Sequence, residues 1–293
     1  MSSDVDLGSP GQTTVAAALE TLAARSAAQM SAENFPVALK IVPARPRADL
    51  ARIYAFARFV DDVGDESDGD RLLLLDAVDA DLHTLWTGGA ARLSAVAGLA
   101  PLIEQHAMPI EPFTDLVQAN RVDQTVGSYA DFDALLGYCR LSAAPIGRMV
   151  LHVAHAASDR NVMDSDAVCA ALQVLEHCQD VGEDARAGRV YLPADDLAAA
   201  GVERADLLAG SASPALRRVV ARQVDRSLEL LGAGRPLVRR LSGWSRVAVS
   251  GYVAGGLATA AALRAADHDV LTSLVKPGKT RTLLSALTTM MGR

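Results

Sequence analysis

The sequence predicts an all-α protein: a single helical bundle built around a central cavity. Half of its 293 residues are apolar but only 4% are aromatic, so the core must consist mostly of Ala, Leu and Val, a composition that favours helices. No window combines period-two alternation with β-branched enrichment, which argues against a sheet. Two stretches place polar residues at helical spacing between apolar neighbours, a pattern typical of helices whose polar stripe faces a cavity.

The first part of the chain is expected to hold three helices after a polar, disordered segment at 1–13. Residues 14–30 are Ala-rich and predict the first helix. Pro36 suits the first turn of a short helix that ends before Pro43. Pro46 then begins the helix that carries the first polar stripe, and the acid-rich residues after it end that helix.

The middle of the chain predicts four more helices. The segment 71–86 is amphipathic and is followed by two glycines, which favour a helix end. Its expected apolar face is formed by Leu72, Leu75, Val78, Leu82 and Leu85. Ser94 could cap a helix to about residue 108, kinked at a proline. Helices at 111–126 and 131–157 follow, and Pro145 with Gly147 interrupts the second.

The last part predicts three helices and a basic tail. Asp164 or Ser165 is expected to cap a helix that continues to about residue 188. Two long helices are expected at 213–231 and 238–266. No linker or repeat divides the chain, so 14–271 is expected to form one domain, followed by the basic segment 272–293.

The net charge, the cysteine spacing and the apolar runs limit which partners and which location are expected. A net charge of −7 argues against nucleic acid. The cysteines Cys139, Cys169 and Cys178 show no paired spacing, so free buried thiols and a cytoplasmic location are expected. The apolar run 247–263 contains three glycines and is shorter than the ~20 residues of a typical membrane span, so a core helix is expected there.

The first polar stripe consists of Tyr54, Arg58, Asp61 and Asp65. Steps of four, three and four residues place all four on one helix face. Carboxylates four residues apart repel each other by a few tenths of a kcal/mol in an isolated helix. Mg²⁺ would offset this repulsion, because it prefers oxygen ligands and binds one or two carboxylates together with phosphates.

The same spacing recurs in Gln173, His177, Asp180 and Asp184, again between apolar residues. Two such helices facing each other would place four carboxylates around one pocket. The alternative for either stripe alone is a solvated helix face. The shared spacing and the apolar flanks of both stripes favour the pocket.

Two long motifs resemble the head-to-head isoprenyl diphosphate synthases, which make squalene, dehydrosqualene, phytoene or hydroxysqualene. They are YAFARFVDDVGDE at 54–66 and DVGEDARAGRVYLP at 180–193. Within that family the stretch 129–153 and the segment beginning at Asn34 resemble the hydroxysqualene synthase branch. The resemblance implies an isoprenoid-synthase-type bundle. Three departures from it are Glu176 and Ala144, where asparagine is expected, and Gln179, where phytoene-type enzymes have arginine.

The resemblance also implies roles for the stripe residues. Mg²⁺ would be held by Asp61 and Asp65 from one side and by Asp180 and Asp184 from the other. Glu176 could ligate it as well, with a geometry changed by its longer side chain and extra charge. Arg58 would contact the diphosphate, because a guanidinium suits phosphate oxygens. Tyr54 would hydrogen-bond a phosphate or stabilise a carbocation, because an aromatic face attracts positive charge. The remaining substrate-binding residues implied by the family are Asn34, Gln173, His177, Gln179, Arg189 and Tyr191.

The implied reaction is the Mg²⁺-dependent conversion of presqualene diphosphate and water to hydroxysqualene and diphosphate, in hopanoid or other triterpenoid synthesis. One alternative is condensation of two prenyl diphosphates to squalene or phytoene. Another is a non-catalytic helical protein that binds isoprenoids or a partner. The tail at 276–293 could form an amphipathic helix and touch a membrane surface, or it could fray.

Some residues keep two interpretations from sequence. His152 and His155 suit zinc binding or, with no third ligand evident, core packing. His177 could contact substrate or hydrogen-bond neighbouring acids. Arg189 and Tyr191 could close over the diphosphate or anchor their loop.

Overall fold

The computed structural model describes residues 15–25 and 42–272. Within them every regular element is a helix, and the one β-type contact is an isolated bridge between Ser128 and Val190. The helices are α2 (Ala44–Asp65), α3 (Arg71–Trp86), α4 (Ser94–Ala97), α5 (Ala100–His106), α6 (Glu111–Asp123), α7 (Phe132–Ser142), α8 (Ala144–Val153), α9 (Asp159–Gln179), α10 (Val181–Arg186), α11 (Ala194–Ala200), the 3₁₀ helix η2 (Arg204–Leu208), α12 (Pro214–Gly234), α13 (Pro236–Arg240) and α14 (Gly243–Ala265). The all-α prediction is therefore confirmed.

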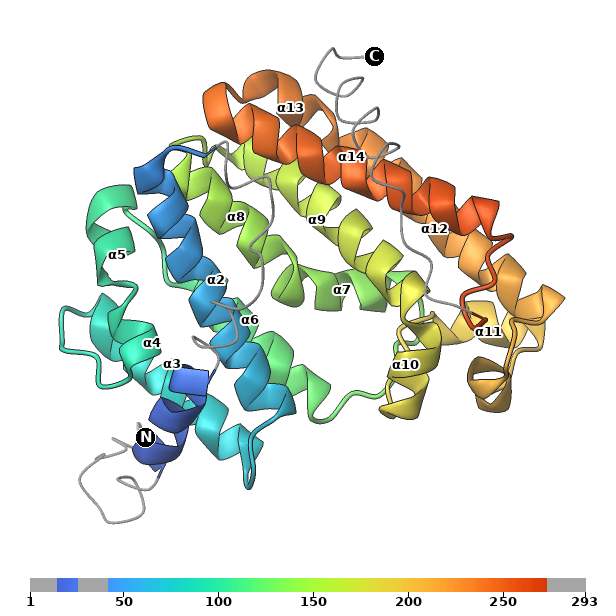
Figure 1. The fold of residues 1–293 in the computed structure, drawn as a ribbon, viewed down its shortest axis with the longest axis horizontal. Coiled ribbons are helices and arrows are strands. Elements are labelled where there is room, and N and C mark those ends of the chain that lie inside the picture. The colour runs from blue at the N-terminus through green and yellow to red at the C-terminus, as the bar shows by residue number, and fades with distance from the viewer. Residues whose placement is uncertain (1–14, 26–41, 273–293) are drawn as a thin grey trace.

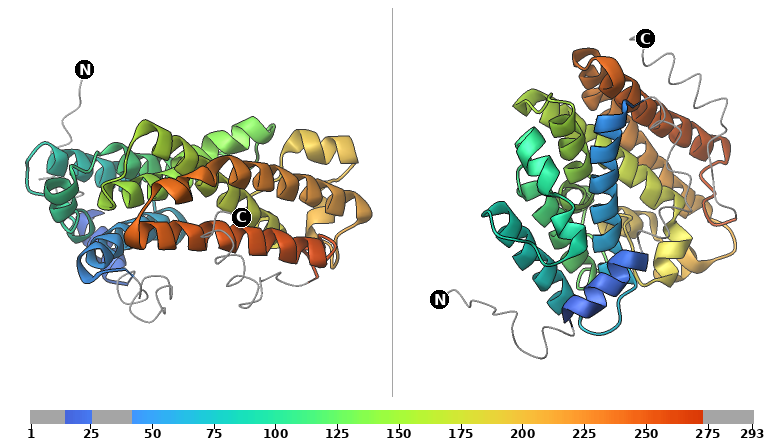
Figure 2. Two further views of the ribbon diagram at one scale, coloured as in Figure 1. Left: turned by 90° about the horizontal axis from the view of Figure 1, so that it is seen from above. Right: turned by 60° about the vertical axis from the view of Figure 1, so that its left-hand side comes forward.

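Several sequence predictions fall outside the described residues. They are the segment 1–13, Asn34, the short helix expected from Pro36 and the basic tail. Residues 15–25 are helical and agree with the central part of the helix predicted at 14–30. This stretch lies at the C-terminal end of α2 (Figure 2), where Arg25 pairs with Glu66 at 3.1 Å.

The helix α3 matches its predicted bounds. Its N-cap is Asp70, whose carboxylate accepts a hydrogen bond from the Leu73 amide. The predicted apolar face is correct except at its first residue: Leu72 is 40% exposed, while Leu74 is buried. Leu72 precedes Asp76 by one turn, so it shares the polar face of α3.

Four predicted helices are each divided in two. The one predicted to continue to about residue 188 forms α9 and α10, on either side of Asp180. The one at 94–108 forms α4 and α5, separated at Gly98 and Leu99. The one at 131–157 forms α7 and α8, which meet at Ala143 just before Pro145. The last one forms the short α13 and the long α14. Proline in the first turn of α5 and α8 explains why a new helix begins at those two points. The division between α13 and α14 has no proline, because α14 begins at Gly243 after Ser242.

The predicted start of the second stripe helix is wrong. The cap of α9 is Ser158, whose hydroxyl accepts from the Asn161 amide, six residues before the expected cap. Asp164 and Ser165 lie inside the helix and are buried. Asp164 is held there by an ion pair with Arg240 of α13, a tertiary contact that local capping preference does not reveal. Both α11 and η2 were also missed.

The core consists of two clusters of buried apolar residues. One joins residues 15–25 and α2–α6 around Phe56, Phe59 and Phe113. The other joins α9, α12 and α14 with the segments near them. The helix α8 lies between α2 and α9 and contributes to both clusters, through Met149 and Leu151 (Figure 1). It therefore connects the two helices that carry the polar stripes.

The helix α14 is long and apolar enough to cross a membrane by length and composition. In the fold it packs against α9, α12 and α13. A Cβ added at Gly256 would lie 2.8 Å from Leu172 Cδ2 and 3.0 Å from Leu231 Cδ1, so a larger residue there would require these leucine side chains to shift. These contacts agree with the core helix predicted from sequence.

Candidate active site

The first acidic pair lies at the C-terminal end of α2, on one helix face as predicted. Asp61 accepts a hydrogen bond of 3.2 Å from the Asn120 amide nitrogen of α6. The approach of Asn120 depends on Gly64, since a Cβ there would lie 2.1 Å from Asn120 Oδ1. The side-chain nitrogen of Gln124 donates a further hydrogen bond to the Gly64 carbonyl at 3.0 Å. Sequence reasoning missed this support, although a glycine within a helix signals a close approach.

The environment of Asp61 disfavours its charge. Water reaches its side chain, yet protein displaces most of the solvent around it, and this desolvation raises the pKa of Asp61 to about 6. The hydrogen bond from Asn120 opposes the rise, whereas the charges of Asp65 and Asp62 add to it. A cation beside this carboxylate would therefore relieve an unfavourable charge.

The other two residues of the first stripe lie nearer the middle of α2. The Arg58 Nε donates to the Asp62 carboxylate at 2.9 Å, an i,i+4 pair in which Asp62 is buried. Tyr54 lies one turn before Arg58 and is half-buried. Arg58 is thus held by Asp62, a residue outside the predicted stripe.

The second acidic pair lies where α9 ends. Asp180 occupies the position between α9 and α10, and its carbonyl accepts from the Asp184 amide at 2.8 Å. Burial raises the pKa of Asp184 to about 7, with the charge of Asp180 adding and that of Arg189 opposing. Burial and Asp180 also raise the pKa of Glu176. The carboxylates of Glu176, Asp180 and Asp184 therefore influence one another here.

One ion pair joins the two acidic segments directly. Arg189, in the loop after α10, donates from Nη1 to Asp65 Oδ1 of α2 at 3.1 Å, across 124 positions of sequence. Its Nε is buried and has no hydrogen-bond partner within the described residues. Of the two roles predicted for Arg189, this contact corresponds to the loop anchor, because it holds the loop after α10 against α2. It also places the Arg189 guanidinium beside the first acidic pair.

The carboxylates suit a hard cation, although not as one compact cluster. All four aspartates offer oxygen, and each pair contains a member whose pKa is raised by burial and by its neighbour. Among residues 15–25 and 42–272, no three His, Cys, Asp or Glu side chains converge closely enough to hold one metal ion. Mg²⁺ usually keeps waters and phosphate oxygens in its coordination shell, so one or two carboxylates per ion fit it.

Behind Arg189 lies a buried aromatic cluster that sequence reasoning did not identify. The hydroxyls of Tyr138 and Tyr191 donate to the two oxygens of Asp123, at 2.7 and 3.3 Å. The Tyr191 ring stacks on His177 with centroids 3.7 Å apart. Tyr191 is buried in this cluster, so its structural role is to anchor the loop that presents Arg189.

His177 packs in this aromatic cluster and does not form an ion pair, because its imidazole is uncharged. Burial and the nearby charge of Arg189 lower the pKa of His177 to about 3, so its imidazole is neutral. Its contact with Asp184, 4.0 Å long, therefore joins a neutral ring to a carboxylate. Its Nε2 lies 3.3 Å from the Gln173 amide nitrogen.

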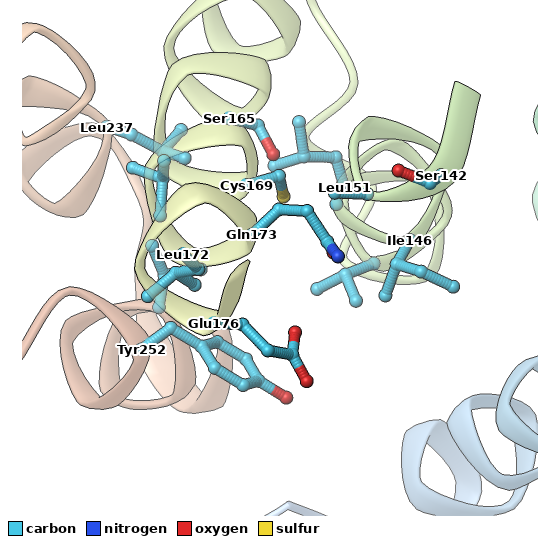
Figure 3. A pocket seen from close by; sticks show the side chains of 15 residues that line it. Ser142, Ile146, Leu151, Ser165, Cys169, Leu172, Gln173, Glu176, Leu237 and Tyr252 are labelled. Carbon is cyan, nitrogen blue, oxygen red and sulfur yellow. The ribbon is translucent and has the colours of Figure 1, made fainter. Parts of the chain in front are cut away.

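The prediction of a cavity within the bundle is confirmed, but its walls differ from those expected. A cavity of about 240 Å³ lies between α8, α9 and α14 (Figure 3). Of the second stripe and its neighbours, only Gln173 and Glu176 line it, and none of the four aspartates does. Most of the wall is apolar, formed by Ile146, Val150, Leu151, Val168, Leu172, Leu237 and Val249.

Other predicted residues have plainer surroundings. Arg121 pairs with Asp76 of α3 at 2.7 Å. The His155 ring lies near that of His106, tilted by 42° with centroids 5.1 Å apart, and no third metal ligand joins them in the described residues. Cys139, Cys169 and Cys178 are free thiols. Gln179 is the last residue of α9.

Comparison with known proteins gives a consistent result. The squalene/phytoene synthase family profile matches residues 28–281. A hydroxysqualene synthase from Rhodopseudomonas palustris is 40% identical over 213 residues, 71% of each chain. Another, from Zymomonas mobilis, is 35% identical and covers 89% of this chain and 88% of its own.

Two solved structures share the fold of this chain. A squalene synthase from Alicyclobacillus acidocaldarius superposes with a TM-score of 0.78 at 35% identity, covering 87% of this chain and 98% of that one. A dehydrosqualene synthase superposes with a TM-score of 0.81 at 19% identity, over 94% and 97% of the two chains, and shares the fold.

Proposed function

The chain belongs to the squalene/phytoene synthase family and is an enzyme of that family, and from this premise we propose that it converts presqualene diphosphate and water into hydroxysqualene and diphosphate. Two relatives with 40% and 35% identity are named hydroxysqualene synthases, which supports this branch of the family. The reaction breaks the carbon–oxygen bond to diphosphate, so the site must stabilise a departing anion and a carbocation.

The observation that carries the proposal is the ion pair between Arg189 and Asp65. It brings a guanidinium and both acidic segments to one region, at 3.1 Å between the paired atoms. A guanidinium suits phosphate oxygens, so Arg189 would transfer from Asp65 to the diphosphate when substrate binds. Arg58, held by Asp62, would add positive charge from the middle of α2.

Magnesium fits this arrangement as the cofactor. It would be held by Asp61 and Asp65 on α2 and by Asp180 and Asp184 near the end of α9, and it would neutralise charge on the diphosphate. Carboxylates with raised pKa values, such as Asp61 and Asp184, bind a cation at the expense of a proton.

The cavity would receive part of the hydrocarbon. At about 240 Å³ it is smaller than the ~300–1,000 Å³ of most small-molecule pockets, so it suits a segment of a C30 chain rather than all of it. Its apolar walls would exclude stray water from the carbocation, while the acidic segments beyond Glu176 hold the diphosphate.

A second candidate is condensation of two prenyl diphosphates to squalene or phytoene. The similarity to a squalene synthase structure at 35% identity favours keeping it. Its substrates would be two allylic diphosphates in place of presqualene diphosphate, with the same acidic segments.

The test is a product assay with three substrates. Purified protein with Mg²⁺ is incubated separately with presqualene, farnesyl and geranylgeranyl diphosphate, and products are identified by mass spectrometry. The proposal expects hydroxysqualene and diphosphate from presqualene diphosphate. Squalene or phytoene from the shorter substrates, with no turnover of presqualene diphosphate, would establish the second candidate instead.

A further inference from the structure

The cavity within the bundle contains one charged side chain among the residues that line it, Glu176. Its carboxylate stands at one end of the cavity, near the Tyr252 hydroxyl and the Gln173 amide (Figure 3). The walls beyond it are mostly apolar. The Glu176 side chain is exposed, so water reaches its carboxylate where it meets the apolar chamber.

Glu176 has no protein partner in the described part of the chain. No hydrogen bond or ion pair to its carboxylate occurs among residues 15–25 and 42–272, whereas Asp65 is paired with Arg189 and Asp62 with Arg58. Its backbone carbonyl accepts from the Asp180 amide at 3.0 Å, so it lies one turn before the second acidic pair. Glu176 therefore faces the cavity from the side on which the diphosphate would bind.

The sequence suggested Glu176 as a metal ligand, and the structure gives it a different neighbourhood. It lines the cavity, which none of the four aspartates does. A carboxylate directed at the hydrocarbon chamber is placed to act on the organic part of the substrate.

Resting on the proposed function, we propose that Glu176 holds the attacking water at the cavity and accepts its proton. The carbon–oxygen bond to diphosphate breaks, and the diphosphate leaves with the electron pair. The water oxygen then forms a bond to the rearranged carbocation, and its proton passes to the Glu176 carboxylate. The products are hydroxysqualene, diphosphate and one proton, so atoms and charge balance.

A carboxylate suits this task better than an amide. It accepts a hydrogen bond from water and turns the oxygen lone pair toward the cation, and its negative charge stabilises the cation. An amide can orient a water but does not take its proton. Gln173, three residues earlier on the same face of α9, also lines the cavity and adds a second polar group there.

The test compares Glu176→Gln with Glu229→Gln, a matched control on the exposed face of α12. Diphosphate release and hydroxysqualene are measured in the same reactions, in ¹⁸O-labelled water. We expect hydroxysqualene per diphosphate released to fall at least tenfold in Glu176→Gln, with hydrocarbon products rising, because a positioned base contributes roughly 10²–10⁴-fold. The control should match the wild type. An unchanged ratio in Glu176→Gln would overturn the inference.

Magnesium binding separates this role from that of a metal ligand. In calorimetric titration without substrate, Mg²⁺ affinity is expected to stay within about twofold of wild type in Glu176→Gln and to fall at least tenfold in Asp180→Asn. An equal fall in both variants would assign Glu176 to the metal and overturn the inference. If wild-type protein releases diphosphate without forming hydroxysqualene, the proposed function fails together with this inference. If wild-type protein forms hydroxysqualene but Glu176→Gln leaves the ratio of hydroxysqualene to diphosphate unchanged, only this inference fails.

Discussion

At the scale of single residues, the first acidic motif depends on a glycine that has no chemistry of its own. Gly64 lets Asn120 reach Asp61, because a methyl group there would overlap the Asn120 side chain. Asn120 in turn opposes the desolvation that raises the pKa of Asp61. A contact of this kind explains why an otherwise unfavourable residue stands within a buried helix.

Gly64→Ala is therefore expected to destabilise the protein by about 1–3 kcal/mol through overpacking, despite the better helix propensity of alanine. The measurement is urea unfolding. The control is Gly232→Ala on α12, where an added Cβ meets nothing within 4 Å and a gain of about 0.5–1 kcal/mol is expected. Similar effects at both glycines would contradict the packing argument.

The raised pKa of Asp184 predicts a pH dependence. Its folded value of about 7 lies above the ordinary 3.8, so its contribution to stability is present below about pH 4 and is lost as pH rises toward 7. Without Mg²⁺, Asp184→Asn should therefore raise the melting temperature relative to wild type, by an amount that grows from pH 4.5 to 7.5. Adding Mg²⁺ at pH 7.5 should shrink or reverse the difference. A constant difference across this range would show that Asp184 does not titrate there.

At the scale of elements, the loop after α10 is positioned by the buried cluster around Asp123. This carboxylate accepts from hydroxyls on α7 and on the loop itself, and the Tyr191 ring rests on His177 of α9. The cluster fixes the segment that presents Arg189 to Asp65. The pairing of the two acidic motifs thus depends on residues that touch neither carboxylate pair.

Asp123→Ala would leave two buried tyrosine hydroxyls without an acceptor, so a loss of about 2–4 kcal/mol in the free energy of unfolding is expected. Asp225→Ala on α12 is the control, because its partner Arg264 is exposed and such pairs contribute about 0–1 kcal/mol. Equal losses in the two variants would mean that the cluster around Asp123 does not hold the loop.

What the sequence predicted at this scale depended on local signals. Both ends of α3 were correct because the amphipathic spacing begins at its first turn and glycines follow its last one. The cap at Asp70 was not predicted. The start of α9 was wrong because Asp164 has the chemistry of a cap but is paired with Arg240 in the folded chain. The acidic pairs were found from their spacing, whereas the bond from Arg189 to Asp65 joins positions 124 residues apart and has no local signature.

At the scale of the whole molecule, two apolar clusters meet around α8 and carry one acidic pair each. The loop after α10 connects the end of α9 with α2 through the ion pair between Arg189 and Asp65. The cavity lies beside these segments, and Gln173 and Glu176 of α9 line it. We therefore propose that these two motifs, distant in sequence, form one site that releases diphosphate next to an apolar chamber.

The most direct test of this claim is the rate of diphosphate release from presqualene diphosphate with Mg²⁺, in Asp61→Asn, Asp180→Asn and the double variant. If both motifs serve one site, each single variant should lose at least about 10²-fold, and the double variant should lose far less than the product of the two. A wild-type rate in either single variant would show that its motif takes no part in releasing diphosphate, and the account of a shared site would be wrong.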